Sequence, residues 1–136
     1  MRMEKFNVAV KAFIVNDNDE ILLVKRSDDD VHKPGVWEVP GGRLDHGENP
    51  FEGLKRETLE ETGIDIDVRN PLRIHHFTRE DGGKITMITF YCRTRSKDVK
   101  LSDEHTDFIW IDIDGAYSKI VNSFQRDIAV LRDHFL

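Results

Sequence analysis

The sequence predicts an α+β fold in which helices cover both faces of one β-sheet. Two observations predict this class: β-rich runs recur along the whole chain, and one helical pattern interrupts them while another ends the chain. Strands combined with a mid-chain and a terminal helix are typical of a sheet packed between helices. The 136 residues correspond to a single domain, residues 1–136, because no repeat or linker divides them.

The first strands are expected on either side of a short polar turn. The runs FNVAVKAFIV and ILLVKR flank the turn-forming cluster NDNDE and predict a hairpin. A polar loop, SDDDVHKPG, follows. The next run, VWEVPGG, predicts a short strand that is stopped by Pro40, Gly41 and Gly42.

A helix is predicted between Pro50 and Thr62. Proline suits the first turn of a helix, and Gly63 suits the C-terminal cap. At about 100° per residue, one stripe of this helix faces the core. Its members are Phe51, Leu54, Thr58 and Thr62.

The second half of the chain predicts five more elements, four strands and a helix. IDIDV alternates as a strand does, and LRIHHFTRE and KITMITFYCRT flank Asp81-Gly82-Gly83 as a second hairpin. DFIWIDI is a further strand. Apolar residues then recur with helical spacing and predict an amphipathic C-terminal helix, at Phe124, Ile128, Leu131 and Phe135.

The charge balance excludes several classes of partner. With 20 Lys+Arg against 26 Asp+Glu, the net charge is −6, and the chain lacks the basic stripe of a nucleic-acid binder or the polybasic cluster of a membrane-surface protein. No apolar run is long enough to span a bilayer, and charges interrupt any signal-peptide core near the N-terminus. The single cysteine, Cys92, excludes an internal disulfide. A cytoplasmic protein is expected.

The predicted mid-chain helix carries three glutamates on one face. With Glu57 taken as zero, Glu60 lies at about −60° and Glu61 at about +40° on the wheel. Like charges four residues apart, and anions in the last turn of a helix, are both unfavourable. Two interpretations stay open: a solvated helix with Arg56 paired to nearby glutamates, or a site for a divalent cation such as Mg²⁺.

The surrounding stretch, GGRLDHGENPFEGLKRETLEETGI, resembles the Nudix box of the Nudix hydrolase family. The matching positions are Gly42, Glu48, Arg56, Glu57, Glu60, Glu61, Gly63 and Ile64. One position departs, because Thr58 stands where the family has a bulky aliphatic residue. The flanking VWEVPG and EHTDFIWID also look like the family. The resemblance implies an α/β/α sandwich with a mixed sheet.

The resemblance also implies a Mg²⁺- or Mn²⁺-dependent hydrolase of nucleoside diphosphates linked to another moiety. Glu60 and Glu61 would ligate the metal, together with the backbone carbonyl of Gly41. Glu57 would be a ligand or the base that takes a proton from water. Arg56 would orient these carboxylates by charge-assisted hydrogen bonds, and Glu48 would belong to the same network.

Four further residues are weighed outside the box. Glu104 either reaches the metal or the water, as an acid near this position does in many relatives, or is a solvated loop acid. His105 beside it is expected at the surface or the substrate edge. Phe77 is either a substrate-pocket or a core residue, and Lys33 either contacts a phosphate or belongs to a solvated loop.

The substrate is expected to be a small nucleotide. Markers of subfamilies that cleave ADP-ribose, dinucleoside polyphosphates, coenzyme A or NADH are not seen, which favours nucleoside triphosphates, including damaged ones, or nucleotide sugars. Two rivals stay open: a diphosphate isomerase, which would use a cysteine, and a non-catalytic nucleotide sensor. The oligomeric state stays open between monomer and homodimer.

Overall fold

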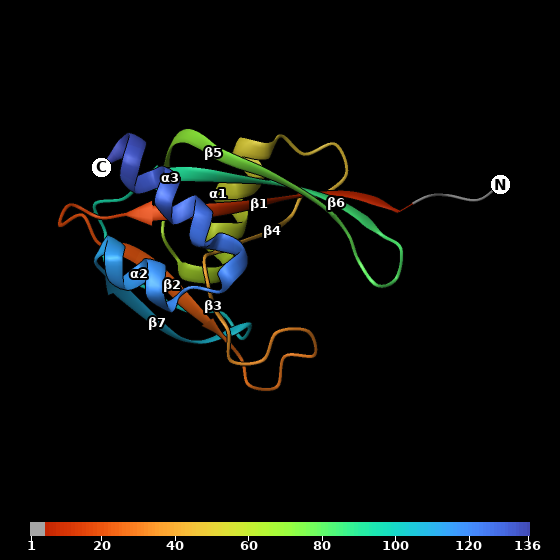
Figure 1. The fold of residues 1–136 in the computed structure, drawn as a ribbon, viewed down its shortest axis with the longest axis horizontal. Helices are drawn as coiled ribbons and strands as arrows, with labels where there is room; N and C mark the ends of the chain where they lie inside the picture. Colours follow the sequence, from red (N-terminus) through yellow and green to blue (C-terminus); the bar gives the residue numbers. More distant parts are fainter. Residues whose placement is uncertain (1–4) are drawn as a thin grey trace.

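The computed structural model describes residues 5–136, so the first four residues of the segment inspected for a signal peptide lie outside it. A sheet runs through the middle of the molecule, with helices on both sides (Figure 1). Its strands are Phe6–Val15 (β1), Ile21–Arg26 (β2), Trp37–Glu38 (β3), Gly41–Arg43 (β4), Asp67–Thr78 (β5), Lys84–Arg93 (β6) and His105–Ile111 (β7). The helices are Pro50–Thr62 (α1), Ile113–Lys119 (α2), the 3₁₀ turn Asn122–Phe124 and Gln125–Phe135 (α3).

The sheet is mixed, with one parallel pair at its centre. β1 runs parallel to β6 from Phe6↔Lys84 to Val15↔Arg93, whereas every other strand pair is antiparallel. The main path follows the order β3-β2-β1-β6-β5, with β4 paired to β1 and β7 paired to β2. The mixed sheet between helices confirms the predicted fold class.

Two apolar cores lie on opposite faces of this sheet. Successive residues of β1 alternate between them: Ile14 belongs to the core beneath α1, which includes Leu54, and Phe13 to the core beneath α3, which includes Ile128. This alternation follows from the two-residue period of a strand. α1 therefore forms one outer layer, and α2 and α3 form the other (Figure 1).

α1 begins and ends as its sequence predicts. The side chain of Asn49 accepts hydrogen bonds from the first turn, Pro50 is the first helical residue, and Gly63 ends the helix in a left-handed conformation (φ 72°). Leu54, Thr58 and Thr62 are buried as expected. Phe51 is 53% exposed instead, because it lies in the first turn and only its ring packs against Phe90.

The region around Pro40 differs from the prediction. The strand does not stop at the glycines: Gly41–Arg43 forms β4, whose partner is β1 rather than β2. Pro40 lacks an N–H group, but its carbonyl accepts a hydrogen bond from Ala12 N at 2.8 Å, so the chain passes from one strand partner to the next.

The segment after α1 also differs from the prediction. Ile64 and Ile66 are buried core residues outside the strand, and one long strand, β5, replaces the two that were expected. β5 contains Pro71, which is tolerated because this strand ends the main path of the sheet and is bulged nearby. The short helix α2, Ile113–Lys119, was not predicted, because its 7 residues are too few to show a helical repeat of apolar side chains.

A buried aspartate joins the C-terminal helix to the sheet. Asp127, in the first turn of α3, is fully buried. It accepts hydrogen bonds from Arg73 Nη1 at 3.1 Å and Thr89 Oγ1 at 2.7 Å, and it lies 3.1 Å from His75 Nε2. The predicted amphipathic helix is thus held by polar contacts as well as by its apolar stripe. No helix within residues 5–136 is long and apolar enough to cross a membrane.

Candidate active site

Arg56 is the centre of a carboxylate cluster on α1. Its Nε and Nη2 donate to the two oxygens of Glu48 at 2.7 and 3.0 Å, which is a bidentate pair. Its Nη1 lies 3.1 Å from Glu57 Oε1 and 3.2 Å from Glu60 Oε2. The hydrogen bonds from Arg56 lower the pKa of Glu48 to about 2. One guanidinium therefore fixes three carboxylates that the sequence singled out.

Glu61 lies next to this cluster but in a different environment. It is only 5% exposed, and its Oε2 accepts a hydrogen bond from the backbone N–H of Gly41 at 2.7 Å. Burial, together with the neighbouring Glu104 and against the opposing effect of Lys11, raises the pKa of Glu61 to about 8. Such a carboxyl lacks a full counter-charge within the protein, which is a property common at functional sites.

Glu57 is half-enclosed by the turn that precedes the helix. Burial raises its pKa, with Arg56 acting in the opposite direction. A Cβ atom at Gly42 would lie 2.7 Å from Glu57 Oε2, so only glycine allows the carboxylate to approach this backbone. At Gly41, φ is 147° and a Cβ would lie 2.0 Å from the carbonyl oxygen of Val10. The two glycines bring β4 against both β1 and the carboxylates.

Glu104 and His105 complete one side of the cluster. Possible ligand atoms of Glu61, Glu104 and His105 lie within 4.8 Å of one another. Glu104 is exposed, whereas His105 is 5% exposed, so His105 does not lie at the surface, and the alternative position at the substrate edge stays a prediction. The reason is a buried partner: His105 Nε2 lies 2.9 Å from Glu38 Oε2.

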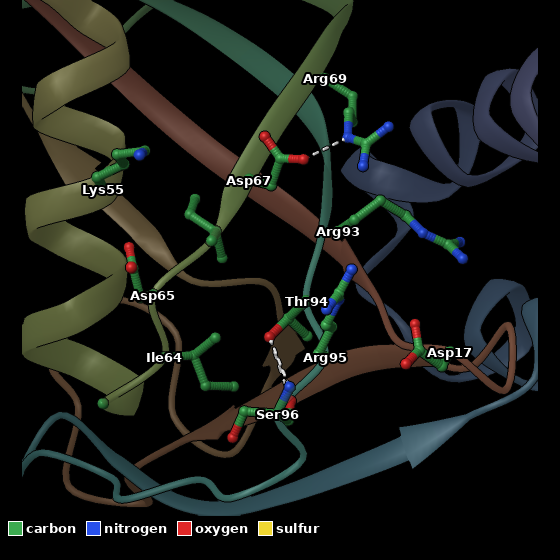
Figure 2. A pocket seen from close by; sticks show the side chains of 12 residues that line it. Asp17, Lys55, Ile64, Asp65, Asp67, Arg69, Arg93, Thr94, Arg95 and Ser96 are labelled. Atoms are coloured by element: carbon green, nitrogen blue, oxygen red, sulfur yellow. Dashed lines mark hydrogen bonds and ion pairs between the residues drawn. The ribbon is translucent and has the colours of Figure 1, made fainter.

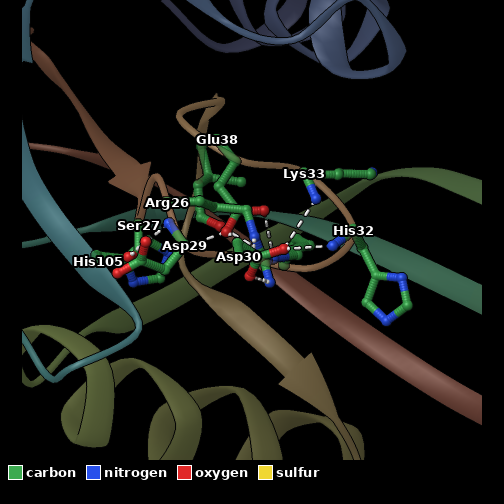
Figure 3. A network of polar contacts seen from close by, with 10 residues as sticks. Arg26, Ser27, Asp29, Asp30, His32, Lys33, Glu38 and His105 are labelled. Atoms are coloured by element: carbon green, nitrogen blue, oxygen red, sulfur yellow. Dashed lines mark hydrogen bonds and ion pairs between the residues drawn. The ribbon is translucent and has the colours of Figure 1, made fainter.

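A buried network around Glu38 was missed by sequence reasoning (Figure 3). Besides His105, Glu38 contacts Lys11 Nζ at 3.2 Å and Arg26 Nη1 at 3.0 Å, and Arg26 continues to Asp30 in the loop after β2. Burial acts to raise the pKa of Glu38, but these cations outweigh it and hold the pKa at about 2. The available signal was Lys11 itself, the one charged residue of the mostly apolar strand β1.

The two predicted substrate residues lie apart from the carboxylates in sequence and in contacts. Phe77 is in β5, paired with Ile85 of β6, and is 42% exposed. Lys33 is exposed in the loop after β2, where its backbone N–H donates to Asp30 Oδ1 at 2.8 Å. Within residues 5–136, neither side chain makes an ion pair or hydrogen bond to the cluster. Their roles stay predictions.

Comparison with known proteins decides the family. A model of the NUDIX domain matches residues 5–131. The chain belongs to the Nudix family. The family resemblance read from the box is therefore confirmed. Nudix hydrolases use divalent metal ions, and the oxygen ligands gathered around Glu61 suit a hard divalent cation.

Several known Nudix proteins are similar to this chain. A MutT-like protein from Streptomyces ambofaciens is 31% identical over 108 residues, covering 79% of this chain and 65% of that protein. The nucleoside triphosphatase NudI from an Enterobacter species is 30% identical, covering 72% of this chain and 77% of that protein. The crystal structure of a MutT protein from Methanosarcina mazei Go1 superposes with a TM-score of 0.84 at 27% identity, covering both chains completely.

The chain spans about two thirds of the Streptomyces protein and 36% of the Nudix hydrolase 2 of Arabidopsis thaliana that it also matches. A Caenorhabditis elegans Ap4A hydrolase has the same fold, with a TM-score of 0.78 at 20% identity. The fold of this chain is thus shared by proteins that are named for different substrates.

Proposed function

We propose that this protein hydrolyses a pyrophosphate bond in a nucleoside diphosphate derivative, with Mg²⁺ or Mn²⁺ as its cofactor. The observation that carries the proposal is the set of contacts that fix the three glutamates of α1: Arg56 contacts Glu57 and Glu60, and the N–H of Gly41 contacts Glu61. Relatives named nucleoside triphosphatase support nucleoside triphosphates, including damaged ones, as the first substrates to test, with nucleotide sugars next.

The metal would be held by the carboxylates of Glu57, Glu60 and Glu61 and the carbonyl of Gly41. When bound, a divalent cation lowers the pKa of a water and neutralises charge on phosphate oxygens. An acidic chain with a net charge of −6 needs such cations to accept a polyanionic substrate.

The protein's own groups supply orientation and proton transfer. Arg56 keeps Glu57 and Glu60 in place through its fork, and Glu48 in turn holds Arg56. Burial raises the pKa of Glu57, which brings this carboxylate closer to the range in which a base works at neutral pH. Glu57 or Glu104 takes the proton of the attacking water.

A nucleotide panel with and without Mg²⁺, read by product mass, tests this function. We expect turnover that disappears with a chelator and returns with Mg²⁺ or Mn²⁺. Glu57→Gln and Glu104→Gln should separate the two candidate bases, because loss of the base lowers kcat by about 10²-fold or more. Glu52→Gln is the matched control, since Glu52 is an exposed acid in the first turn of the same helix.

The same panel addresses both rivals. Nucleotide binding without turnover in the presence of Mg²⁺ would replace hydrolysis with the sensor interpretation. The isomerase interpretation is not supported, because Cys92 is buried and burial raises the pKa of its thiol. A thiol in that state is not a ready nucleophile.

A further inference from the structure

A cavity outside the carboxylate cluster lies beside the C-terminal half of α1, on the face of the helix that carries Lys55 (Figure 2). Its volume is about 840 Å³, which falls in the size range of sites for small ligands. Its walls come from the end of α1, the start of β5, the end of β6 and the turn between β1 and β2. None of Glu57, Glu60, Glu61 or Glu104 lines it.

α1 separates the two sites. Lys55, which lines the cavity, is about 160° from Glu57 around the helix axis at 100° per residue. Ile64, Ile66 and Thr94 are buried residues of the cavity lining. A molecule bound here would contact the face of α1 opposite to the carboxylate cluster.

Basic side chains gather around the cavity, although the protein has a net negative charge. Four cationic side chains line it: Lys55, Arg69, Arg93 and Arg95. Figure 2 shows the three arginines on one side of the cavity, with Lys55 and Asp65 on the other. Like charges gathered from neighbouring strands repel each other unless an anion lies between them.

These arginines are only partly neutralised by the protein. Arg69 pairs with Asp67 at 2.7 Å, but both side chains are more than half exposed, and Arg93 pairs with Asp19 at 3.3 Å. Within residues 5–136, Lys55 and Arg95 have no carboxylate within ion-pair distance. A guanidinium without a partner offers the planar fork that matches a phosphate.

The C-terminal end of α1 does not prevent an anion from binding here. Helix C-termini carry partial negative charge on unpaired carbonyls. The last carbonyls of α1 are occupied, because Thr62 O accepts from Lys100 N at 2.8 Å and Glu61 O accepts from Ser102 N at 3.1 Å.

Two carboxylates of the cavity lining restrict which anions the cavity can bind. Asp17 and Asp65 line the same cavity and, within the described residues, have no cationic partner. They would repel a bare polyphosphate but accept hydrogen bonds from hydroxyl or amino groups. We propose that this cavity binds a small phosphorylated molecule with neighbouring hydroxyl or amino donors, the chemistry of a nucleoside monophosphate, at a site separate from the carboxylate cluster.

Binding of AMP to the metal-free protein tests the proposal. Amide shifts of the ¹⁵N-labelled protein are followed during titration with AMP in excess chelator, so that hydrolysis plays no part. We expect saturable shifts at residues 64–67 and 93–96. In Arg95→Ala the dissociation constant should rise about tenfold, because a charge-assisted contact to phosphate is lost. This outcome does not depend on whether the protein is a hydrolase.

Arg132→Ala is the matched control, since Arg132 is an exposed arginine of α3 that pairs only with its neighbour Asp133. It should bind AMP as the wild type does. Inorganic phosphate and adenosine serve as probes for the two halves of the ligand, and AMP should bind more tightly than either. Absence of saturable shifts at these amides, equal affinity in Arg95→Ala and Arg132→Ala, or adenosine as tight as AMP would each overturn the proposal.

Discussion

Substitution of Arg56 by lysine separates the effect of its positive charge from the effect of its planar guanidinium geometry. Lysine keeps the charge but cannot hold Glu48 bidentately while reaching Glu57. We expect Arg56→Lys to lower kcat by about tenfold or more, equivalent to roughly 1.4 kcal/mol in the barrier, with a smaller change in melting temperature. Steady-state kinetics and thermal unfolding measure the two effects. A variant with wild-type kcat would reduce Arg56 to a surface ion pair.

Glu61 makes the stability of the metal-free protein depend on pH. Its pKa is raised by burial from 4.5 to about 8, so the folded state binds more protons than the unfolded state between these values. Its contribution is fully present below pH 4.5 and is lost as the pH rises through 8, with a slope of up to about 1.4 kcal/mol per pH unit. Glu61→Gln should flatten this part of the profile. Urea unfolding in chelator at several pH values measures it, and identical profiles would contradict the assignment.

At the scale of the helix, the last turn of α1 carries acidic and no basic residues, although the helix dipole disfavours anions at this end. Glu60 lies in the last turn, where an anion is disfavoured, and among residues 5–136 only Arg56 forms an ion pair with it. Glu60→Gln should weaken Mg²⁺ binding while the stability of the protein holds or rises. Titration calorimetry with Mg²⁺ and thermal unfolding check both parts. Unchanged metal affinity in both Glu60→Gln and Glu61→Gln would show that the metal binds elsewhere.

α3 depends on a polar contact as much as on its apolar stripe. Asp127→Ala removes the acceptor of Arg73 and Thr89, and we expect a loss of about 2–3 kcal/mol in the free energy of unfolding. Asp133→Ala, an exposed acid of the same helix, should change it by less than about 0.5 kcal/mol. Chemical denaturation compares the two, and equal effects would show that the apolar stripe alone holds the helix.

Local signals predicted the elements whose determinants are local. Pro50 and Gly63 delimited α1, and Asp81-Gly82-Gly83 placed the turn between β5 and β6. β4 was missed because its identity depends on pairing with β1, which no nearby residue reveals.

Within the candidate site, spacing on one helix predicted that Glu57, Glu60 and Glu61 share a face, whereas the central place of Arg56 was implied only by the resemblance to the Nudix box. The buried position of His105 did not, because its partner Glu38 lies 67 residues away in sequence. Ionisable residues are seldom fully buried unless they are paired, and a partner this distant in sequence cannot be recognised from the sequence alone.

At the scale of the whole molecule, Glu61 of α1 lies near Glu104 and against Gly41 of β4. This grouping of carboxylates predicts that water attacks phosphorus rather than a sugar carbon. Glu57 and Glu61, fixed by Arg56 and Gly41, would hold a divalent cation that neutralises charge on phosphate oxygens, whereas attack at a sugar carbon would require a carboxylate pair flanking a glycosidic bond. Hydrolysis in ¹⁸O-labelled water should therefore place the label on a phosphate-containing product. Mass spectrometry of the products measures this. Label found only on a sugar hydroxyl would contradict attack of water at phosphorus.

The parallel pairing of β1 with β6 has a consequence for how the chain is made. Because Phe6 pairs with Lys84 and Val15 with Arg93, the edge of β1 opposite β2 and β4 has no partner until β6 has been synthesised. Pairings between such distant segments form slowly. Until then this edge of the run FNVAVKAFIV stays unpaired. An unpaired strand edge is a template for pairing with another chain, so aggregation is favoured during that interval.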